Sequence, residues 1–338
     1  INSIYNLGNQ VLQAWEEIQR INIAENFKNI ANVVISGMGG SALGGRVVDS
    51  LLVDRVRVPI EIISDYKLPA YINNQTLVIL SSYSGNTQET LSAYHDALNK
   101  DAQIFAITTG GELGSLLTKN NNLAYIFNPK YNPSHQPRMG LGYSISSTLA
   151  ILSLTKVLYI SDDEVANIVQ KINQEIESNS LDVTLGRNLA KGIAFKLKDK
   201  IVNIISSEHL SGISHAFKNQ INENSKTFSN LFEIPELNHH LIEGLQNPRM
   251  VLKSLIFLFI ESELYSLELR KRYPLTKEVL GKNNLDYVAI KLKLSTKLEQ
   301  IFELLTIGSF VSFYLAMLYE IDPTPIPWVD YFKARLSK

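Results

Sequence analysis

The chain has 338 residues, of which 45% are hydrophobic and 19% charged, so it can bury one or two ordinary cores, and two domains are expected. Its net charge of -1 leaves no basic surplus to neutralise a nucleic-acid backbone, so a nucleic-acid partner is not expected. The absence of cysteine excludes disulfides, thiolate zinc sites and cysteine nucleophiles together, and it fits a cytoplasmic protein.

Attachment to a membrane is not expected either. The longest apolar run without charges, residues 304–319, is shorter than the roughly 20 residues that a membrane span requires. It predicts a buried core helix. No secretory signal is recognisable in the sequence, which starts at Ile1.

The first predicted strand, residues 33–35, leads into a glycine-rich turn at 37–45 and then into a helix at 46–53. Glycines let the backbone turn sharply and approach a ligand, and Ser41 offers a hydroxyl where the helix starts. This arrangement is typical of a turn that holds a phosphate group.

The same turn fits a second class of protein. Gly37, Gly39 and Ala42 satisfy the dinucleotide fingerprint, and Asp65 follows the next predicted strand, 60–63, about where a ribose-binding acid is expected. Taken alone, the turn therefore leaves an NAD-dependent oxidoreductase as an alternative.

A hydroxyl-rich turn, residues 81–87, follows the third predicted strand, 77–80, and precedes a helical pattern at 89–98. Free backbone N–H groups, Ser and Thr hydroxyls and the positive end of the helix dipole would all face one anion there. The turn contains no lysine, so it suits a sugar phosphate monoester better than a nucleoside triphosphate. The alternative is an ordinary turn that caps a helix.

The two turns support each other, because a dinucleotide site has no need of a second hydroxyl-rich turn one strand later. Parallel neighbouring strands end at the same edge of a sheet, so both turns can contact one phosphate. We therefore favour a sugar phosphate site over a dinucleotide site.

The second half of the chain repeats the order of elements. A strand segment at 201–207 leads to a helix at 210–222, a further strand ends at 232–237, and the apolar run 251–260 predicts another strand. Short apolar strands that alternate with amphipathic helices indicate parallel sheets covered on both faces.

The predicted fold class is therefore α/β, with two doubly wound parallel-sheet domains in tandem. We place the first domain at residues 1–152 and the second at 153–338, with a charged connector helix at 162–179.

Several motifs together resemble one known family, the bifunctional phosphoglucose/phosphomannose isomerases, which contain two sugar isomerase (SIS) domains. The resemblance runs in order from about residue 30 to the C-terminus. It rests on the glycine-rich segment 37–45, Asp65 to Pro69, Ser82 to Thr87, Pro137 to Tyr143, Lys218 to Lys226, Pro235 to His239, and Asp322 to Pro325 followed by Lys333.

The resemblance implies a role for particular residues. The expected phosphate-binding residues are Gly40, Ser41, Ser82, Ser84 and Thr87. The expected catalytic residues are Arg138 near the reacting carbons, Glu223 as base, His239 as the ring-opening residue and Lys333 at the ring oxygen. It further implies a homodimer in which His239 reaches the site of the neighbouring subunit.

The chemistry of these residue types agrees with that expectation. Conversion of an aldose into a ketose moves a proton between C1 and C2 through an enediolate. It needs a carboxylate base, a cation beside the developing oxyanion, and an acid or base for the hemiacetal. Arg138 would do the electrostatic work of a metal, so no metal and no cofactor is expected.

Each catalytic candidate also has a plainer interpretation. Glu223 could end a solvated helix, Arg138 could cap a loop, and Lys333 could be a surface lysine near the terminus. The spacing of His239, His240 and Glu243 also permits a metal pair on a helix. His135, Lys130 and Arg270 are expected to be solvated.

Two other classes of protein remain as alternatives: a non-catalytic sensor of phosphosugars, and an NAD-dependent oxidoreductase that would use the turn from Gly37 to Ala42. A non-catalytic sensor of phosphosugars could keep the phosphate turns and lack the base. A glucosamine-phosphate synthase needs a cysteine nucleophile, which this chain lacks.

The chain also departs from the family pattern at two places. Where the family commonly reads Asn-His-Asn-Glu, this chain has His240 and Leu241 after Asn238 and His239. Where the family often has arginine, two positions before the lysine that matches Lys218, it has Ala216. These departures leave the preference between glucose and mannose phosphates open.

Overall fold

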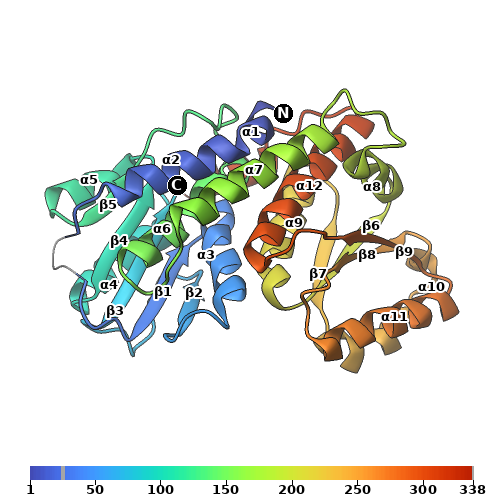
Figure 1. Ribbon diagram of the computed structural model, residues 1–338, viewed down its shortest axis with the longest axis horizontal. Coiled ribbons are helices and arrows are strands. Elements are labelled where there is room, and N and C mark those ends of the chain that lie inside the picture. The colour runs from blue at the N-terminus through green and yellow to red at the C-terminus, as the bar shows by residue number, and fades with distance from the viewer. Residues whose placement is uncertain (24–26, 337–338) are drawn as a thin grey trace. The chain divides into compact units, whose positions relative to one another are not determined.

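The computed structural model describes residues 1–23 and 27–336, which fold into two compact units (Figure 1). The first unit comprises residues 1–176, 208–216 and 294–306, and the second comprises 177–207, 217–293 and 307–338. Each unit is made of three separate segments of the chain, so no single position in the sequence divides one unit from the other. The domain boundary near residue 152 remains a prediction.

The first unit contains a sheet of five parallel strands in the order β2-β1-β3-β4-β5. The strands are β1 (Asn32–Gly37), β2 (Ile60–Ile63), β3 (Thr76–Ser82), β4 (Gln103–Thr108) and β5 (Leu123–Ile126). Every residue of β3 is buried, as expected for a central strand that is covered on both faces.

The order of these strands reverses between β1 and β3. The chain runs outward from β1 to the edge strand β2, then returns to the other side of β1 and continues through β4 to β5. In open parallel sheets, ligands bind at the carboxyl ends of the strands where such a reversal occurs. This rule points to the loops that follow β1 and β3.

Seven α-helices and one 3-10 helix accompany this sheet in the described residues before Asn179. They are α1 (Asn2–Tyr5), α2 (Leu7–Gln19), α3 (Gly39–Leu52), α4 (Gln88–Asn99), α5 (Gly111–Lys119), η1 (Pro137–Met139), α6 (Leu141–Leu154) and α7 (Asp162–Asn179).

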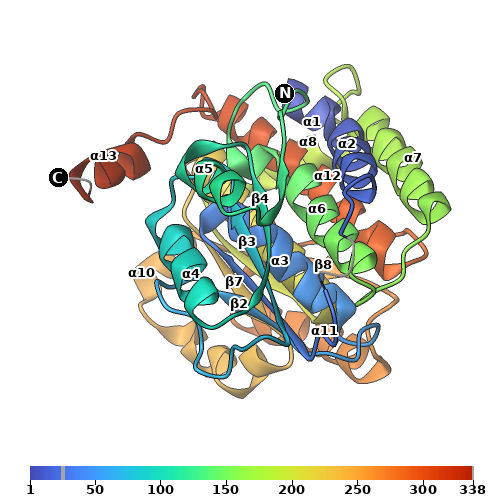
Figure 2. The same ribbon diagram turned by 90° about the vertical axis from the view of Figure 1, so that its left-hand side faces the viewer.

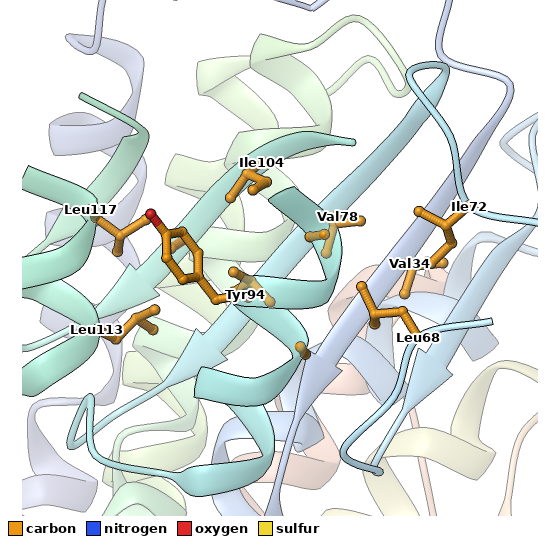
Figure 3. Close-up of a cluster of buried hydrophobic side chains, with 12 residues drawn as sticks. Val34, Leu68, Ile72, Val78, Tyr94, Ile104, Leu113 and Leu117 are labelled. Carbon is orange, nitrogen blue, oxygen red and sulfur yellow. The ribbon is translucent and has the colours of Figure 1, made fainter. Parts of the chain in front are cut away.

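One face of the first sheet packs against α4 and α5 through a cluster of buried side chains (Figure 3). Val34, Val78 and Ile104 contribute from three strands, and their neighbours in sequence face the other side of the sheet. The Tyr94 ring reaches toward Leu117, and its hydroxyl is hydrogen-bonded to Asn120 and Asn122. A buried phenol therefore has the polar partners that it needs.

The second unit repeats the first four strands of this topology. Its parallel sheet has the order β7-β6-β8-β9, so the first strand again lies between the second and the third. The strands are β6 (Ile201–Ser206), β7 (Ser229–Glu233), β8 (Leu255–Glu261) and β9 (Asp286–Lys291). The predicted α/β class with parallel sheets is confirmed.

Helices make up much of the remaining chain (Figures 1 and 2). The α-helices are α8 (Leu189–Leu197), α9 (Ser211–Asn224), α10 (Arg249–Leu252), α11 (Leu267–Lys282), α12 (Lys297–Leu318) and α13 (Pro327–Leu336). The 3-10 helices are η2 (Glu208–Leu210), η3 (Glu236–His239) and η4 (Leu241–Gln246). Among the described helices, α12 is long and apolar enough to cross a membrane. However, 83% of its most apolar stretch is buried inside the protein, as in a core helix.

Two predicted elements begin in the wrong place. The helix predicted at 46–53 already starts at Gly39, because glycine and small residues can form a first turn that packs closely against other backbone. The strand predicted from residue 251 starts at Leu255, since Pro248 precedes the short helix α10 and fixes the backbone angle for a helix start.

Candidate active site

The loops after β1 and β3 lie against each other, as the strand order requires. The hydroxyl oxygen of Ser41, in the first turn of α3, accepts the backbone N–H of Tyr83 at 2.9 Å. The Ser81 hydroxyl donates to the backbone carbonyl of Ser41 at 2.8 Å. The glycine-rich turn and the hydroxyl-rich turn therefore form one surface.

The hydroxyls of residues 82–87, hereafter the hydroxyl loop, have different degrees of exposure. Ser82 is 0% exposed; its hydroxyl accepts from the Gly85 backbone N–H at 3.1 Å and donates to the Thr87 hydroxyl at 2.9 Å. Ser84 is exposed, and its oxygen accepts from the Asn86 N–H at 3.2 Å. The hydroxyl oxygens of Ser84 and Thr87 thus act as acceptors inside the loop. Each hydroxyl can still donate its proton to another partner, such as a ligand.

The hydroxyl loop ends at the N-terminus of α4. Thr87 is the N-cap residue and its side chain makes no capping hydrogen bond within the described structure. The backbone N–H groups of the first turn and the helix dipole are therefore available to an anion. Glu89 also lies in this turn, but its carboxylate faces the Tyr66 phenol and raises the pKa of Tyr66.

Gly85 is required for the shape of the hydroxyl loop. Its φ of +71° lies in the left-handed region, and a Cβ atom there would come within 1.8 Å of the Gly110 carbonyl oxygen. The segment after β4, which carries Gly110 and the first turn of α5, is in turn bound to the hydroxyl loop, because the Leu113 N–H donates to the Gly85 carbonyl at 2.9 Å. No other residue type fits this position without displacement of both loops.

Arg138 lies in η1, on the segment between β5 and α6, and is 1% exposed. Its Nη1 donates to the Gln136 Oε1 at 2.8 Å. A Cβ atom on Gly40 would lie 2.9 Å from the backbone nitrogen of Arg138, so the glycine allows the start of α3 to approach η1 closely. Six predicted site residues of the first unit therefore share one neighbourhood: Gly40, Ser41, Ser82, Ser84, Thr87 and Arg138.

The approach of the Gly40 backbone to a phosphate stays a prediction. In the structure, its missing side chain also makes room for Pro137 and Arg138. Sequence analysis also missed Tyr83, Asn132 and Gln136, which connect the hydroxyl loop to Arg138. The position of Gln136 two residues before Arg138 was the one available signal.

The other three predicted catalytic residues belong to the second unit. Glu223 is half-buried and is the penultimate residue of α9, where the Lys226 Nζ donates to its backbone carbonyl at 2.8 Å. His239 is the last residue of η3 and is exposed. Lys333 is exposed in α13, a helix with no buried residue, which lies near the C-terminal end in Figure 2.

The two departures from the family pattern differ in their surroundings. Ala216 is fully buried in α9, so its position holds a small side chain. His240 is exposed, and its Nε2 lies 3.9 Å from a carboxylate oxygen of Glu236. Throughout the described residues, no group of three or more His, Cys, Asp or Glu side chains is arranged to hold a metal ion.

Comparison with known proteins identifies the family. The bifunctional phosphoglucose/phosphomannose isomerase of Caldicellulosiruptor bescii is 36% identical, over 99% of this chain and 98% of its own length. The chain belongs to this family. The corresponding enzyme of Aquifex aeolicus is 29% identical over 96% of this chain and 94% of its own. The resemblance inferred from the motifs is thus confirmed.

Two further comparisons concern a domain of the chain and its fold. The family model of the bacterial phospho-glucose isomerase C-terminal SIS domain matches residues 186–336. The crystal structure of tagatose-6-phosphate ketose/aldose isomerase from Escherichia coli has the same fold, with a TM-score of 0.73 and 17% identity over 96% of this chain and 95% of that one.

The geometry of the hydroxyl loop predicts the effect of Gly85→Ala. The substitution should lower the free energy of unfolding by at least ~1–2 kcal/mol, because the left-handed backbone and the contact with the Gly110 carbonyl both oppose a Cβ atom. Gly114→Ala is the matched control. Gly114 lies inside α5, and a Cβ atom there would be 3.9 Å from its nearest neighbours, so this substitution should raise the free energy of unfolding by up to ~1 kcal/mol. Urea denaturation measures both, and equal stabilities would contradict the assigned loop geometry.

Proposed function

We propose that this protein interconverts glucose 6-phosphate, and also mannose 6-phosphate, with fructose 6-phosphate through an enediolate, without a metal or a cofactor. The observation that carries the proposal is the convergence of the hydroxyl loop and Arg138 at the strand reversal of the first sheet. Neutral donors suit a phosphate monoester, and one adjacent guanidinium suits an oxyanion that forms during the reaction.

The phosphate group would be bound by the hydroxyls of Ser41, Ser84 and Thr87 and by the first-turn N–H groups of α4. Ser82 is too deeply buried to reach a ligand, so it acts by orienting Thr87. Gly40 would let its backbone approach the phosphate, and its missing side chain allows the start of α3 to lie close to Arg138. A doubly charged phosphate gains more from several fixed neutral donors in a partly buried loop than from mobile hydroxyls in water.

The proton transfers need three further groups. We assign Glu223 as the base that moves the proton between C1 and C2, His239 as the group that opens the sugar ring, and Lys333 as the cation at the ring oxygen. These assignments rest on the match to the family motifs. Arg138 would stabilise the negative charge on the enediolate, which is the work that a metal performs in other isomerases.

Dual specificity follows from the same intermediate. Glucose and mannose 6-phosphates differ only at C2, which becomes planar in the enediolate. The two substrates can therefore share Glu223 if the site has space for rotation about the C2–C3 bond. No additional catalytic residue is needed for the second substrate.

The arrangement of the chain is part of the proposal. The repeated strand order supports two SIS domains in tandem, with residues 1–152 as the first and 153–338 as the second. We further propose a cytoplasmic homodimer in which His239 completes the site of the neighbouring subunit, so that an isolated subunit is inactive.

The first test is a coupled assay with glucose 6-phosphate and with mannose 6-phosphate, before and after dialysis against EDTA. Both substrates should yield fructose 6-phosphate, and turnover should persist after chelation, with well under one metal ion per chain by elemental analysis. Absence of turnover together with phosphosugar binding would identify a non-catalytic sensor. If chelation abolishes turnover and zinc restores it, a metal held by His239 and Glu243, and not Arg138, stabilises the oxyanion.

The second test concerns the hydroxyl loop. The pair Ser84→Ala and Thr87→Val should raise KM for glucose 6-phosphate by tenfold or more and change kcat little, because each lost hydrogen bond to a charged group is worth about 1.5–3 kcal/mol. The control pair Ser115→Ala and Thr118→Val removes exposed hydroxyls that bond to carbonyls of their own helix, α5. An unchanged KM in the first pair would mean that the phosphate binds elsewhere.

The third test concerns the base. Glu223→Gln should keep KM near that of the wild type and lower kcat by roughly a hundredfold or more, the usual contribution of a general base. Glu268→Gln, an exposed carboxylate at the start of α11, is the control and should leave both constants unchanged. Turnover near the wild-type value in Glu223→Gln would remove this residue from the mechanism.

A further inference from the structure

The Arg138 side chain is held by a polar network that neither the family resemblance nor the motifs assign. One partner of Arg138 is Gln136, whose Oε1 accepts from Nη1 at 2.8 Å. An acceptor at one end of a planar guanidinium restricts its rotation and fixes the direction of its remaining N–H groups. The orientation of Arg138 therefore depends in part on how Gln136 is held.

Gln136 is held by Asn132, which is 0% exposed. The Asn132 amide donates one N–H to the Gln136 backbone carbonyl at 2.9 Å and the other to the Tyr83 hydroxyl at 3.0 Å. Its carbonyl oxygen accepts from the Ser134 hydroxyl at 2.7 Å. A buried amide with all of these groups satisfied is a rigid connection, because any alternative arrangement leaves a polar group unpaired.

Tyr83 belongs to the hydroxyl loop and completes the connection. Its backbone N–H donates to Ser41, while its side chain points to Asn132. Burial raises the pKa of Tyr83, so the phenol stays protonated near neutral pH. One continuous chain of hydrogen bonds thus runs from Ser41 through Tyr83, Asn132 and Gln136 to Arg138.

Helix α2 restrains the same segment from another side. Gln10, fully buried on α2, donates from Nε2 to the backbone carbonyls of Tyr131 at 3.2 Å and Met139 at 3.0 Å. These two carbonyls lie on either side of Gln136 in the sequence. The segment is therefore fixed before and after the residue that contacts Arg138.

We propose that Gln136 is a positioning residue for Arg138, and that Asn132 and Tyr83 transmit the position of the hydroxyl loop to it. The catalytic part of this inference rests on the proposed function. If the guanidinium points away from the developing oxyanion, the transition state loses more stabilisation than the bound substrate does. Loss of the network should therefore lower kcat and leave phosphate binding intact.

The kinetic test compares Gln136→Met with Gln19→Met. Methionine keeps the length of the side chain and removes the acceptor, and Gln19 is an exposed glutamine at the end of α2. Gln136→Met should lower kcat about 10- to 100-fold with KM changed less than about threefold, whereas Gln19→Met should match the wild type. An unchanged kcat in Gln136→Met, or a rise in KM alone, would overturn the proposal.

A spectroscopic test separates this inference from the proposed function. In the protein with isotope-labelled arginine, the side-chain nitrogen signals of Arg138, assigned through Arg138→Lys, should show restricted rotation in the wild type. They should shift and exchange faster in Gln136→Met and recover in Gln136→Glu, which keeps an oxygen acceptor. Unchanged Arg138 signals in the methionine variant would refute the positioning role even if the wild type had no isomerase activity.

A second variant covers the case in which Gln136→Met does not fold. Tyr83→Phe removes the hydroxyl oxygen that accepts one of the two amide N–H groups of Asn132, and it keeps the backbone bond to Ser41. It should move the Arg138 signals in the same direction and lower kcat with KM retained. A variant that folds and leaves both unchanged would show that Arg138 is held independently of the hydroxyl loop.

Discussion

The parallel pairing of β1 with β3 is the constraint on which the first unit depends. Its register places Gly37 opposite Ser81, so the loops that follow β1 and β3 leave the sheet side by side at its carboxyl edge. Because successive residues face opposite sides of the sheet, a shift by one residue would exchange the buried faces of the whole strand. The hydrogen bond from Tyr83 to Ser41 then fixes the first turn of α3 against the hydroxyl loop. The position of the site is thus a consequence of core packing.

A buried guanidinium is stable only when its charge is compensated and its donors are satisfied. The neutral side-chain oxygen of Gln136 satisfies one donor of Arg138. A neutral acceptor orients the cation and leaves its charge undiminished, whereas a carboxylate in the same place would cancel much of the field. The same principle applies in the hydroxyl loop, where neutral hydroxyls and amides are pre-oriented without a lysine.

Much of this arrangement could be predicted from local sequence. The apolar run before each turn predicted buried parallel strands, and the glycine-rich and hydroxyl-rich segments indicated that two loops would meet. The start of α3 at Gly39 was missed, because glycine is a poor helix former and gives no local signal for a helix that packing imposes. The bond from Asn132 to Tyr83 was also missed, because it joins loops 49 residues apart and depends on the path of the chain between β5 and α6.

The second sheet shows why repeated topology does not by itself repeat a site. At the end of β6, the Ser207 hydroxyl donates to the Ile234 carbonyl at 2.8 Å and lies 3.1 Å from the Tyr273 hydroxyl. The Ser207 N–H donates to the Tyr265 hydroxyl at 3.3 Å. After β6, the N–H and hydroxyl donors of Ser207 therefore bind other groups of the protein, whereas the donors after β1 face outward. Two tyrosine hydroxyls contact Ser207 in place of a ligand. Glu261 ends β8 and Glu263 follows it, where the first unit has its hydroxyl loop, and their negative charges oppose the binding of an anion. The strand order fixes where a ligand can bind, and the side chains at the strand ends decide whether one does.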